Sequence, residues 1–170
     1  AVRLETVWAA GLRRMVLEGG VGVLRDDLRR GSLIVPDVAI RDEGTSYHYL
    51  LPGQPAQASP ALREGLLSAC RRRGVVPHEG KVWTTDGIYR ETWRKVERFR
   101  AEGAVCVDME ASALFAVAAY RGMELAALFY AGDSVAKPRW QPRRSKRHLA
   151  RASQDQESLL EIAVDALLER

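Results

Sequence analysis

Short apolar runs alternate along this chain with longer segments of helical periodicity, and no other feature constrains the fold as strongly. The runs expected to form strands are 15–17, 33–35, 81–84, 104–107 and 124–130. Helical spacing of apolar residues occurs in 1–15, 59–74, 89–102, 109–122 and from about 148 to 170. Strands that alternate with helices predict an α/β fold with helices on both faces of a sheet.

Local signals fix several of these boundaries. In the segment 59–74, Ser59 stands at a helix N-cap, Pro60 at the first helical position and Gly74 just past the end. The segment 109–122 is rich in small residues, which suits close packing on a sheet, and Gly122 ends it. The glycines at 19–22 predict a turn between two strands.

Composition places the chain among globular domains. Of its 170 residues, 46% are apolar and 28% are charged with both signs mixed, which excludes a disordered tail. We expect a single domain over 1–170, with no membrane-spanning segment and a cytoplasmic location. The two cysteines lack metal or redox spacing, and no metal or cofactor is expected.

The net charge of +4 suggests nucleic-acid binding, a hypothesis that we disfavour. Much of the basic excess lies in 137–148, KPRWQPRRSKRH, where Trp140 could stack on a base. A solvated basic loop explains this composition equally well. Nucleic acid is therefore an unlikely partner on sequence grounds.

Polar residues that directly follow predicted strands are the first candidates for chemistry, because ligands gather beyond the carboxyl ends of strands in α/β sheets. The candidate segments are 19–22, 41–49, 84–92, 107–110 and 131–134. The glycines at 19–22 match neither the dinucleotide nor the P-loop pattern. Taken alone, they favour backbone geometry over ligand binding.

Two acids in these segments are informative. Glu110 follows a strand and begins a helix, where a carboxylate could accept hydrogen bonds from two sugar hydroxyls or serve only as a helix-start acid. Asp133 ends another strand and is either a general acid or a turn cap. The residues alone leave both alternatives open.

In this order, the segments resemble the nucleoside phosphorylase superfamily of the hexameric purine nucleoside and uridine phosphorylase type. VDMEASALFAVA (107–118) is similar to its ribose-binding segment, and AGDSVA (131–136) to the strand end that carries the base-protonating aspartate of purine members. GGVGVLRDDLRRGSLIVP (19–36) is similar to its glycine-turn hairpin. RDEGTSYHYL (41–50) and TTDGIYRET (84–92) resemble the uridine phosphorylase branch, so purine or pyrimidine preference stays open.

The resemblance implies a fold, an assembly and a set of site residues. The fold is α/β, a three-layer sandwich with a central mixed β-sheet flanked by helices, lacking the family's usual N-terminal section; the assembly is a homo-oligomer, a dimer or a hexamer. Glu110 would hold the ribose with Met109 packed against the sugar, and Asp133 would protonate or hydrogen-bond the departing base. The base pocket would be lined by Thr84, Thr85, Ile88, Tyr89 and Arg94. The arginine that assists the aspartate stays open among Arg143, Arg144, Arg147 and Arg151.

The phosphate half of the implied site departs from the family. Gly20 and Gly22 fall at the phosphate-binding position, but Gly20 stands where the family has a serine or threonine, and the usual arginine is absent. Glu18 beside them would repel a dianion, since like charges about 4 Å apart cost roughly 4 kcal/mol each at an effective dielectric near 20.

We therefore expect a nucleoside phosphorylase-like protein whose partners are a nucleoside and possibly phosphate. Its ancestral reaction is reversible phosphorolysis of the N-glycosidic bond to free base and (deoxy)ribose 1-phosphate, with an impaired phosphate site; water is the other conceivable nucleophile. The alternative is a non-catalytic oligomeric scaffold or partner subunit derived from the family. Activity of this chain as an enzyme stays open at this point.

Overall fold

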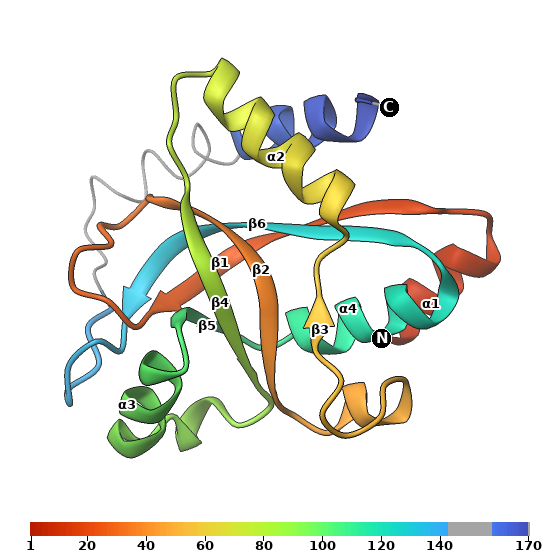
Figure 1. The fold of residues 1–170 in the computed structure, drawn as a ribbon. Coiled ribbons are helices and arrows are strands. Elements are labelled where there is room, and N and C mark those ends of the chain that lie inside the picture. Colours follow the sequence, from red (N-terminus) through yellow and green to blue (C-terminus); the bar gives the residue numbers. More distant parts are fainter. Residues whose placement is uncertain (143–157, 170) are drawn as a thin grey trace.

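The computed structural model describes residues 1–142 and 158–169 of the chain. In chain order the elements are α1 (Val2–Ala9), β1 (Arg14–Val23), β2 (Leu33–Asp42), the 3₁₀ helix η1 (Thr45–His48), β3 (Ala56–Gln57), α2 (Pro60–Arg72), β4 (His78–Thr85), the 3₁₀ helix η2 (Ile88–Arg90), α3 (Trp93–Ala101), β5 (Ala104–Asp108), α4 (Ala111–Arg121) and β6 (Glu124–Ser134). A further helix covers 158–168 (Figure 1). The predicted alternation of strands and helices is confirmed.

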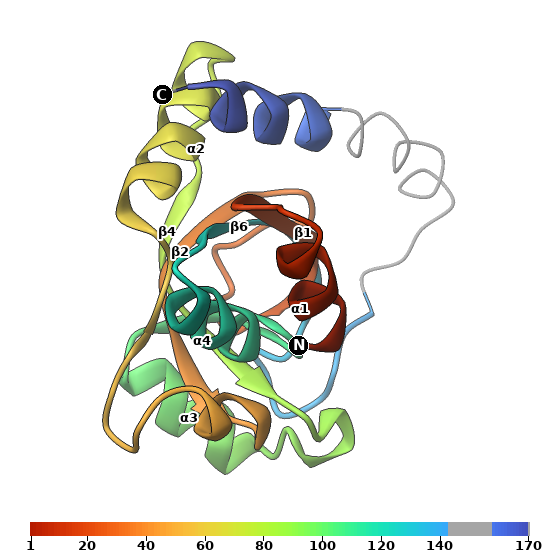
Figure 2. The ribbon, with the colours of Figure 1, turned by 90° about the vertical axis from the view of Figure 1, so that its right-hand side faces the viewer.

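The strands form one mixed sheet in the order β3-β2-β4-β5-β1-β6. Neighbours β2–β4, β4–β5 and β1–β6 are parallel, whereas β1–β5 and β2–β3 are antiparallel. The first residues of β2 also pair with β6, so the sheet curls back on itself (Figure 2). The central mixed sheet flanked by helices is confirmed, and its closure through β2 and β6 is a feature that the pattern of strands did not predict.

Helices cover the sheet in groups. Helix α2 and the helix 158–168 lie together on one side, and α1 and α4 lie together on another (Figure 2). Arg73, directly after α2, forms an ion pair with Asp165 of the helix 158–168, and its Nη2 lies 2.8 Å from Asp165 Oδ2. Small buried residues along α4, such as Ala111, Ala116 and Ala118, let this helix approach closely. Gly122 ends α4, as predicted, and has a left-handed φ of 64°.

A second, smaller apolar cluster lies between α3 and the sheet. Trp83 and Phe99 pack with ring centroids 4.7 Å apart, and Leu24, Val96 and Val107 complete the contact. This cluster supports the floor of the site described below, because Val96 and Val107 also face that site.

The turn predicted at 19–22 is wrong, because these glycines lie inside β1. Gly19 and Gly20 pair in register with Phe129 and Tyr130 of β6. A Cβ on Gly20 would lie 2.8 Å from the ring of Tyr130, and one on Gly22 would lie 3.0 Å from Val107 Cγ1. Close approach of neighbouring side chains, and not chain reversal, is what favours glycine at positions 20 and 22.

Other boundaries shift by a few residues. The helix predicted over 89–102 begins only at Trp93, after the 3₁₀ turn η2. Strand β6 continues past Tyr130 to Ser134, so Asp133 belongs to the strand itself. The basic segment 137–148 and the helix predicted from about 148 lie partly outside the described residues. Within those residues, no helix is both long enough and apolar enough to cross a membrane.

Candidate functional site

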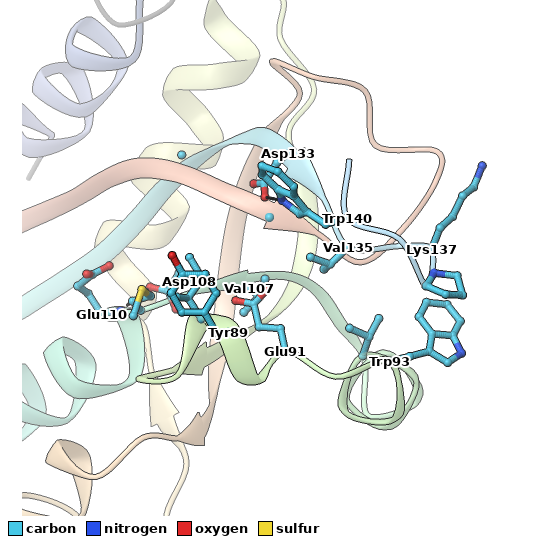
Figure 3. A pocket seen from close by; sticks show the side chains of 16 residues that line it. Tyr89, Glu91, Trp93, Val107, Asp108, Glu110, Asp133, Val135, Lys137 and Trp140 are labelled. Atoms are coloured by element: carbon cyan, nitrogen blue, oxygen red, sulfur yellow. Dashed lines mark hydrogen bonds between the residues drawn. The ribbon is translucent and has the colours of Figure 1, made fainter. Parts of the chain in front are cut away.

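A cavity of about 630 Å³ opens at the C-terminal parts of β1, β5 and β6, beside η2 and the start of α3 (Figure 3). Its lining residues are Gly20, Gly22, Ile88, Tyr89, Glu91, Trp93, Val96, Val107, Asp108, Met109, Glu110, Asp133, Val135, Lys137, Pro138 and Trp140. Asp108, Glu110 and Asp133 lie at or next to strand ends. The segments after β4 and β6 supply Glu91, Lys137 and the aromatic side chains.

The junction of β5 and α4 forms one wall. Asp108 is buried, and its Oδ2 accepts hydrogen bonds from the backbone N–H of Glu110 at 3.1 Å and of Ala111 at 2.6 Å. A carboxylate in this position satisfies N–H groups that the first helical turn leaves without partners. Glu110 is thereby fixed as the N-cap residue of α4, with its own side chain exposed and Met109 beside it.

Behind this wall lies a buried polar network. Thr84 donates its hydroxyl to Asp108 Oδ1 at 2.7 Å and accepts the N–H of Ser112 at 3.0 Å. The Ser112 hydroxyl donates to Glu43 at 2.7 Å, and Glu43 accepts the N–H of Ser46 at 3.0 Å. The network ties β2, β4 and β5 to the start of α4, so the position of Glu110 depends on all four elements.

The two buried carboxyls of the network respond differently to burial. Burial raises the pKa of Asp108 to about 6, against the opposing effect of its hydrogen bonds from Thr84 and the helix N-terminus. Burial also opposes ionisation of Glu43, but hydrogen bonds from Ser46 and Ser112 outweigh it and lower the pKa of Glu43. The protein therefore stabilises the ionised form of Glu43 better than that of Asp108.

The opposite wall carries Asp133. The indole N–H of Trp140 donates to Asp133 Oδ2, which orients the carboxylate. Gly22 lies close to this carboxylate, since a Cβ there would lie 3.5 Å from Asp133 Oδ1, an ordinary van der Waals contact. The tighter contact of that Cβ, 3.0 Å, would be with Val107 Cγ1.

Glu91, which lies between η2 and α3, also lines the cavity (Figure 3). Burial, and then the negative charge of Asp133, raises the pKa of Glu91 to about 7. Carboxyl groups with such a pKa in a cavity are candidates for ligand binding or proton transfer. Sequence reasoning did not single out Glu91, although it lies in the polar segment 84–92 that follows a predicted strand.

The structure brings most of the predicted site residues together. Seven of them line the cavity, namely Asp133, Glu110, Met109, Ile88, Tyr89, Gly20 and Gly22. Three do not. Thr84 and Thr85 are buried behind the wall and hydrogen-bond within the protein, whereas Arg94 is exposed on α3. Arg143, Arg144, Arg147 and Arg151 lie outside the described residues.

Sequence reasoning missed several lining residues. Asp108 directly follows a predicted strand, which was a usable signal, and Trp140 was considered only for nucleic acid. Trp93 and Val135 carry no sequence signal beyond an apolar side chain, and only the fold turns them toward the cavity. In the described part of the chain, no three His, Cys, Asp or Glu side chains are grouped to hold a metal ion.

Comparisons with known proteins agree with this architecture. Residues 1–169 match the family described as "Phosphorylase superfamily". Guanosine phosphorylase of Halorubrum lacusprofundi is 26% identical over 75% of this chain and 53% of its own length. Uridine phosphorylase of Thermococcus kodakarensis is 27% identical over 72% of this chain and 49% of its own length. The chain spans about half the length of these curated relatives.

Two solved structures share the fold. Purine nucleoside phosphorylase from Toxoplasma gondii, in complex with immucillin-H, superposes with a TM-score of 0.83 at 21% identity, covering 97% of this chain and 66% of that one. AMP nucleosidase from Bacteroides thetaiotaomicron gives 0.78 at 24% identity, covering 98% and 64%. At these identities the likeness concerns the fold alone.

Proposed function

Because the chain belongs to the phosphorylase superfamily, we propose that its cavity binds a purine or pyrimidine nucleoside and that its reaction is cleavage of the N-glycosidic bond. The ancestral form of this reaction is reversible phosphorolysis, a pentosyl transfer in nucleoside salvage. Relatives named guanosine, uridine and purine nucleoside phosphorylase support the substrate class. A cytoplasmic homo-oligomer, dimeric or hexameric, is part of the same proposal.

The observation that carries the proposal is that Glu110 and Asp133, 23 positions apart in the sequence, face the same cavity from opposite walls. Among the described residues, nothing forms a hydrogen bond or ion pair with the Glu110 carboxylate, so both of its oxygens are available to the two hydroxyls of a ribose. Met109 would pack against the sugar.

Asp133 is proposed to act on the base. The Trp140 indole occupies one carboxylate oxygen, and the other faces the side of the cavity above Gly22. As the C1′–N bond breaks, its electron pair passes to the base, phosphate or water forms the new bond to C1′, and Asp133 would hydrogen-bond or protonate the departing base. General-acid help of this kind contributes on the order of 10² to 10⁴ in rate.

Phosphate binding is proposed to be weak in this chain. The Tyr130 ring fills the space above Gly20, where the family places a phosphate-binding hydroxyl. Of the described residues, Lys137 is the only cationic one that lines the cavity. Water, or anion-binding groups from a neighbouring subunit, would then complete the site.

Base release from inosine, adenosine and uridine, each with and without phosphate, tests the proposal. We expect release with at least one nucleoside, and expect Glu110→Ala to abolish it while the matched variant Glu97→Ala, an exposed site on α3, does not. Binding of no nucleoside by folded protein would refute the proposal. It would favour the alternative, a non-catalytic scaffold or partner subunit.

A further inference from the structure

The cavity presents an excess of negative side chains. Glu91, Asp108, Glu110 and Asp133 all line it, against Lys137 as the one cationic lining residue in the described chain. The ammonium of Lys137 lies 3.9 Å from Asp26 Oδ1, and its side chain extends away from the carboxyls of the cavity (Figure 3). The described lining therefore offers no compensating charge to an acid at its centre.

Three of these four acids have a role already, and Glu91 does not. Asp108 receives hydrogen bonds from Thr84 and the start of α4, and Asp133 receives one from Trp140. Glu110 is proposed to hold the ribose. Among the described residues, the Glu91 carboxyl has no hydrogen bond or ion pair. The charged group that affects the pKa of Glu91 is Asp133, which is also negative.

Within residues 1–142 and 158–169, no cationic group lowers the pKa of Glu91. Burial and the Asp133 charge raise the pKa of Glu91 to about 7, so a further negative charge beside Glu91 is unfavourable. A positive group placed beside Glu91 would remove that resistance, because it favours the ionised carboxylate. An anionic group would add to it.

Aromatic side chains line the same cavity, and one of them, Trp93, already has the guanidinium of Arg100 5.4 Å from its ring centroid. Trp140 and Trp93 line the cavity together with Tyr89, and they come from three different segments. Aromatic faces attract cations, most strongly when the cation is delocalised and easily desolvated. A planar heterocycle with a positive charge would satisfy both the carboxylate and the rings.

We propose that the cavity selects nucleosides whose base carries a positive charge, and that Glu91 is the residue that compensates this charge. The inference rests on the proposed function, since it assumes that a nucleoside occupies the cavity. It adds the chemical class of the base: an N-alkylated or otherwise quaternised heterocycle, in preference to a neutral base or a nucleotide.

Two isomeric nucleosides provide the test. At neutral pH, 1-methyladenosine carries a positive charge, whereas N6-methyladenosine has the same atoms apart from that proton and is neutral. Titration calorimetry of the full chain with each should give at least about tenfold tighter binding of 1-methyladenosine, a difference of about 1.4 kcal/mol. Nicotinamide riboside, a fixed pyridinium cation, should behave like 1-methyladenosine.

The variant Glu91→Gln keeps the side-chain shape and removes the charge. It should bring the affinities for the two isomers to within about threefold, whereas Glu97→Gln, which removes an exposed carboxylate of α3, should leave the preference unchanged. A thermal melt of each variant confirms that it is folded.

The outcomes separate this inference from the proposed function. Equal or tighter binding of N6-methyladenosine overturns the selection for cations while leaving nucleoside binding intact. A preference that survives Glu91→Gln overturns the role of Glu91. Failure of every nucleoside to bind overturns the proposed function and this inference together.

Discussion

The phenol ring of Tyr130 lies where a side chain on Gly20 would have to go. A Cβ on Gly20 would be 2.8 Å from both Cζ and the hydroxyl oxygen of Tyr130. Parallel pairing of β1 and β6 sets the two residues directly opposite each other, so the sheet register itself produces the contact. Since Gly20 lines the cavity, the choice of tyrosine at 130 determines what this part of the wall can accept.

Substituting Gly20 with alanine should therefore destabilise the protein. The added methyl group must displace a half-buried ring, and overpacking of this kind costs about 1 to 3 kcal/mol in the free energy of unfolding. Gly19→Ala is the matched control, because nothing lies within 4 Å of a Cβ at that position of the same strand. Urea denaturation of both variants measures the difference.

Removing the Tyr130 ring should reduce the cost of the Gly20→Ala substitution. In the background Tyr130→Ala, the substitution Gly20→Ala should cost less than it does beside Tyr130, giving a coupling of about 1 kcal/mol or more. Equal costs in the two backgrounds would mean that Tyr130 is not the obstacle.

These glycines also mark what the sequence could and could not predict. Local patterns correctly predicted the helix from Pro60, the end of α4 at Gly122 and the buried run of β6. A glycine cluster has two common causes, a turn or a close approach, and its letters do not distinguish them. The second cause depends on Tyr130, which lies 110 positions away from Gly20.

Stability should depend on pH through Glu91. The pKa of Glu91 is about 7 in the folded protein, above the ordinary value of 4.5, so the folded state holds a proton that the unfolded state releases. The resulting stability is complete below pH 4.5 and is lost as pH rises through 7. Glu91→Gln should thus gain about 1 to 3 kcal/mol over the wild type at pH 8 and nothing at pH 4.5.

Unfolding in guanidinium chloride at the two pH values provides the measurement. Glu97→Gln, at an exposed site of α3, should differ from the wild type by the same small amount at both. If the difference in stability between Glu91→Gln and the wild type is the same at pH 4.5 and pH 8, the Glu91 carboxyl ionises freely in the folded protein.

The hydroxyl of Thr84 and the carboxylate of Asp108 should act as one unit. Thr84→Val leaves Asp108 Oδ1 and the N–H of Ser112 without their partner, at a cost of about 1 to 3 kcal/mol. Asp108→Asn disturbs the same bonds, so the double variant should cost less than the sum of the two single variants. Strict additivity in urea denaturation would exclude the coupling.

Part of the candidate site could be predicted from the sequence alone. Strand ends pointed to Glu110 and Asp133, because the carboxyl ends of strands collect ligand-facing residues. The same rule also selected Thr84, whose hydroxyl turned out to support Asp108 from behind the wall. Whether a polar side chain faces the cavity or the core depends on the packing of α4, and no single segment of sequence contains that information.

The last prediction concerns Arg41, which organises the loop after β2. Its guanidinium donates to Ser46 Oγ at 2.8 Å and to the carbonyls of Leu50, Leu51 and Gln54 at 2.9 Å each. Its cation also lies 4.1 Å from the ring centroid of Tyr47. Arg41 therefore bonds to both ends of the loop, a role that depends on its rigid, planar set of donors.

Lysine keeps the charge of Arg41 but has only three N–H donors on one nitrogen, so Arg41→Lys should lose at least one of these four bonds and loosen the loop. We expect amide hydrogen exchange at Leu50 and Leu51 to speed up by about tenfold, equivalent to about 1.4 kcal/mol in local opening. Arg98→Lys, which alters the exposed pair with Glu102 and the contact with the Phe99 ring on α3, is the control and should leave these amides unchanged. Unaltered exchange in Arg41→Lys would mean that the backbone bonds of η1 hold the loop by themselves, since the amides of Tyr49 and Leu50 both donate to the Ser46 carbonyl.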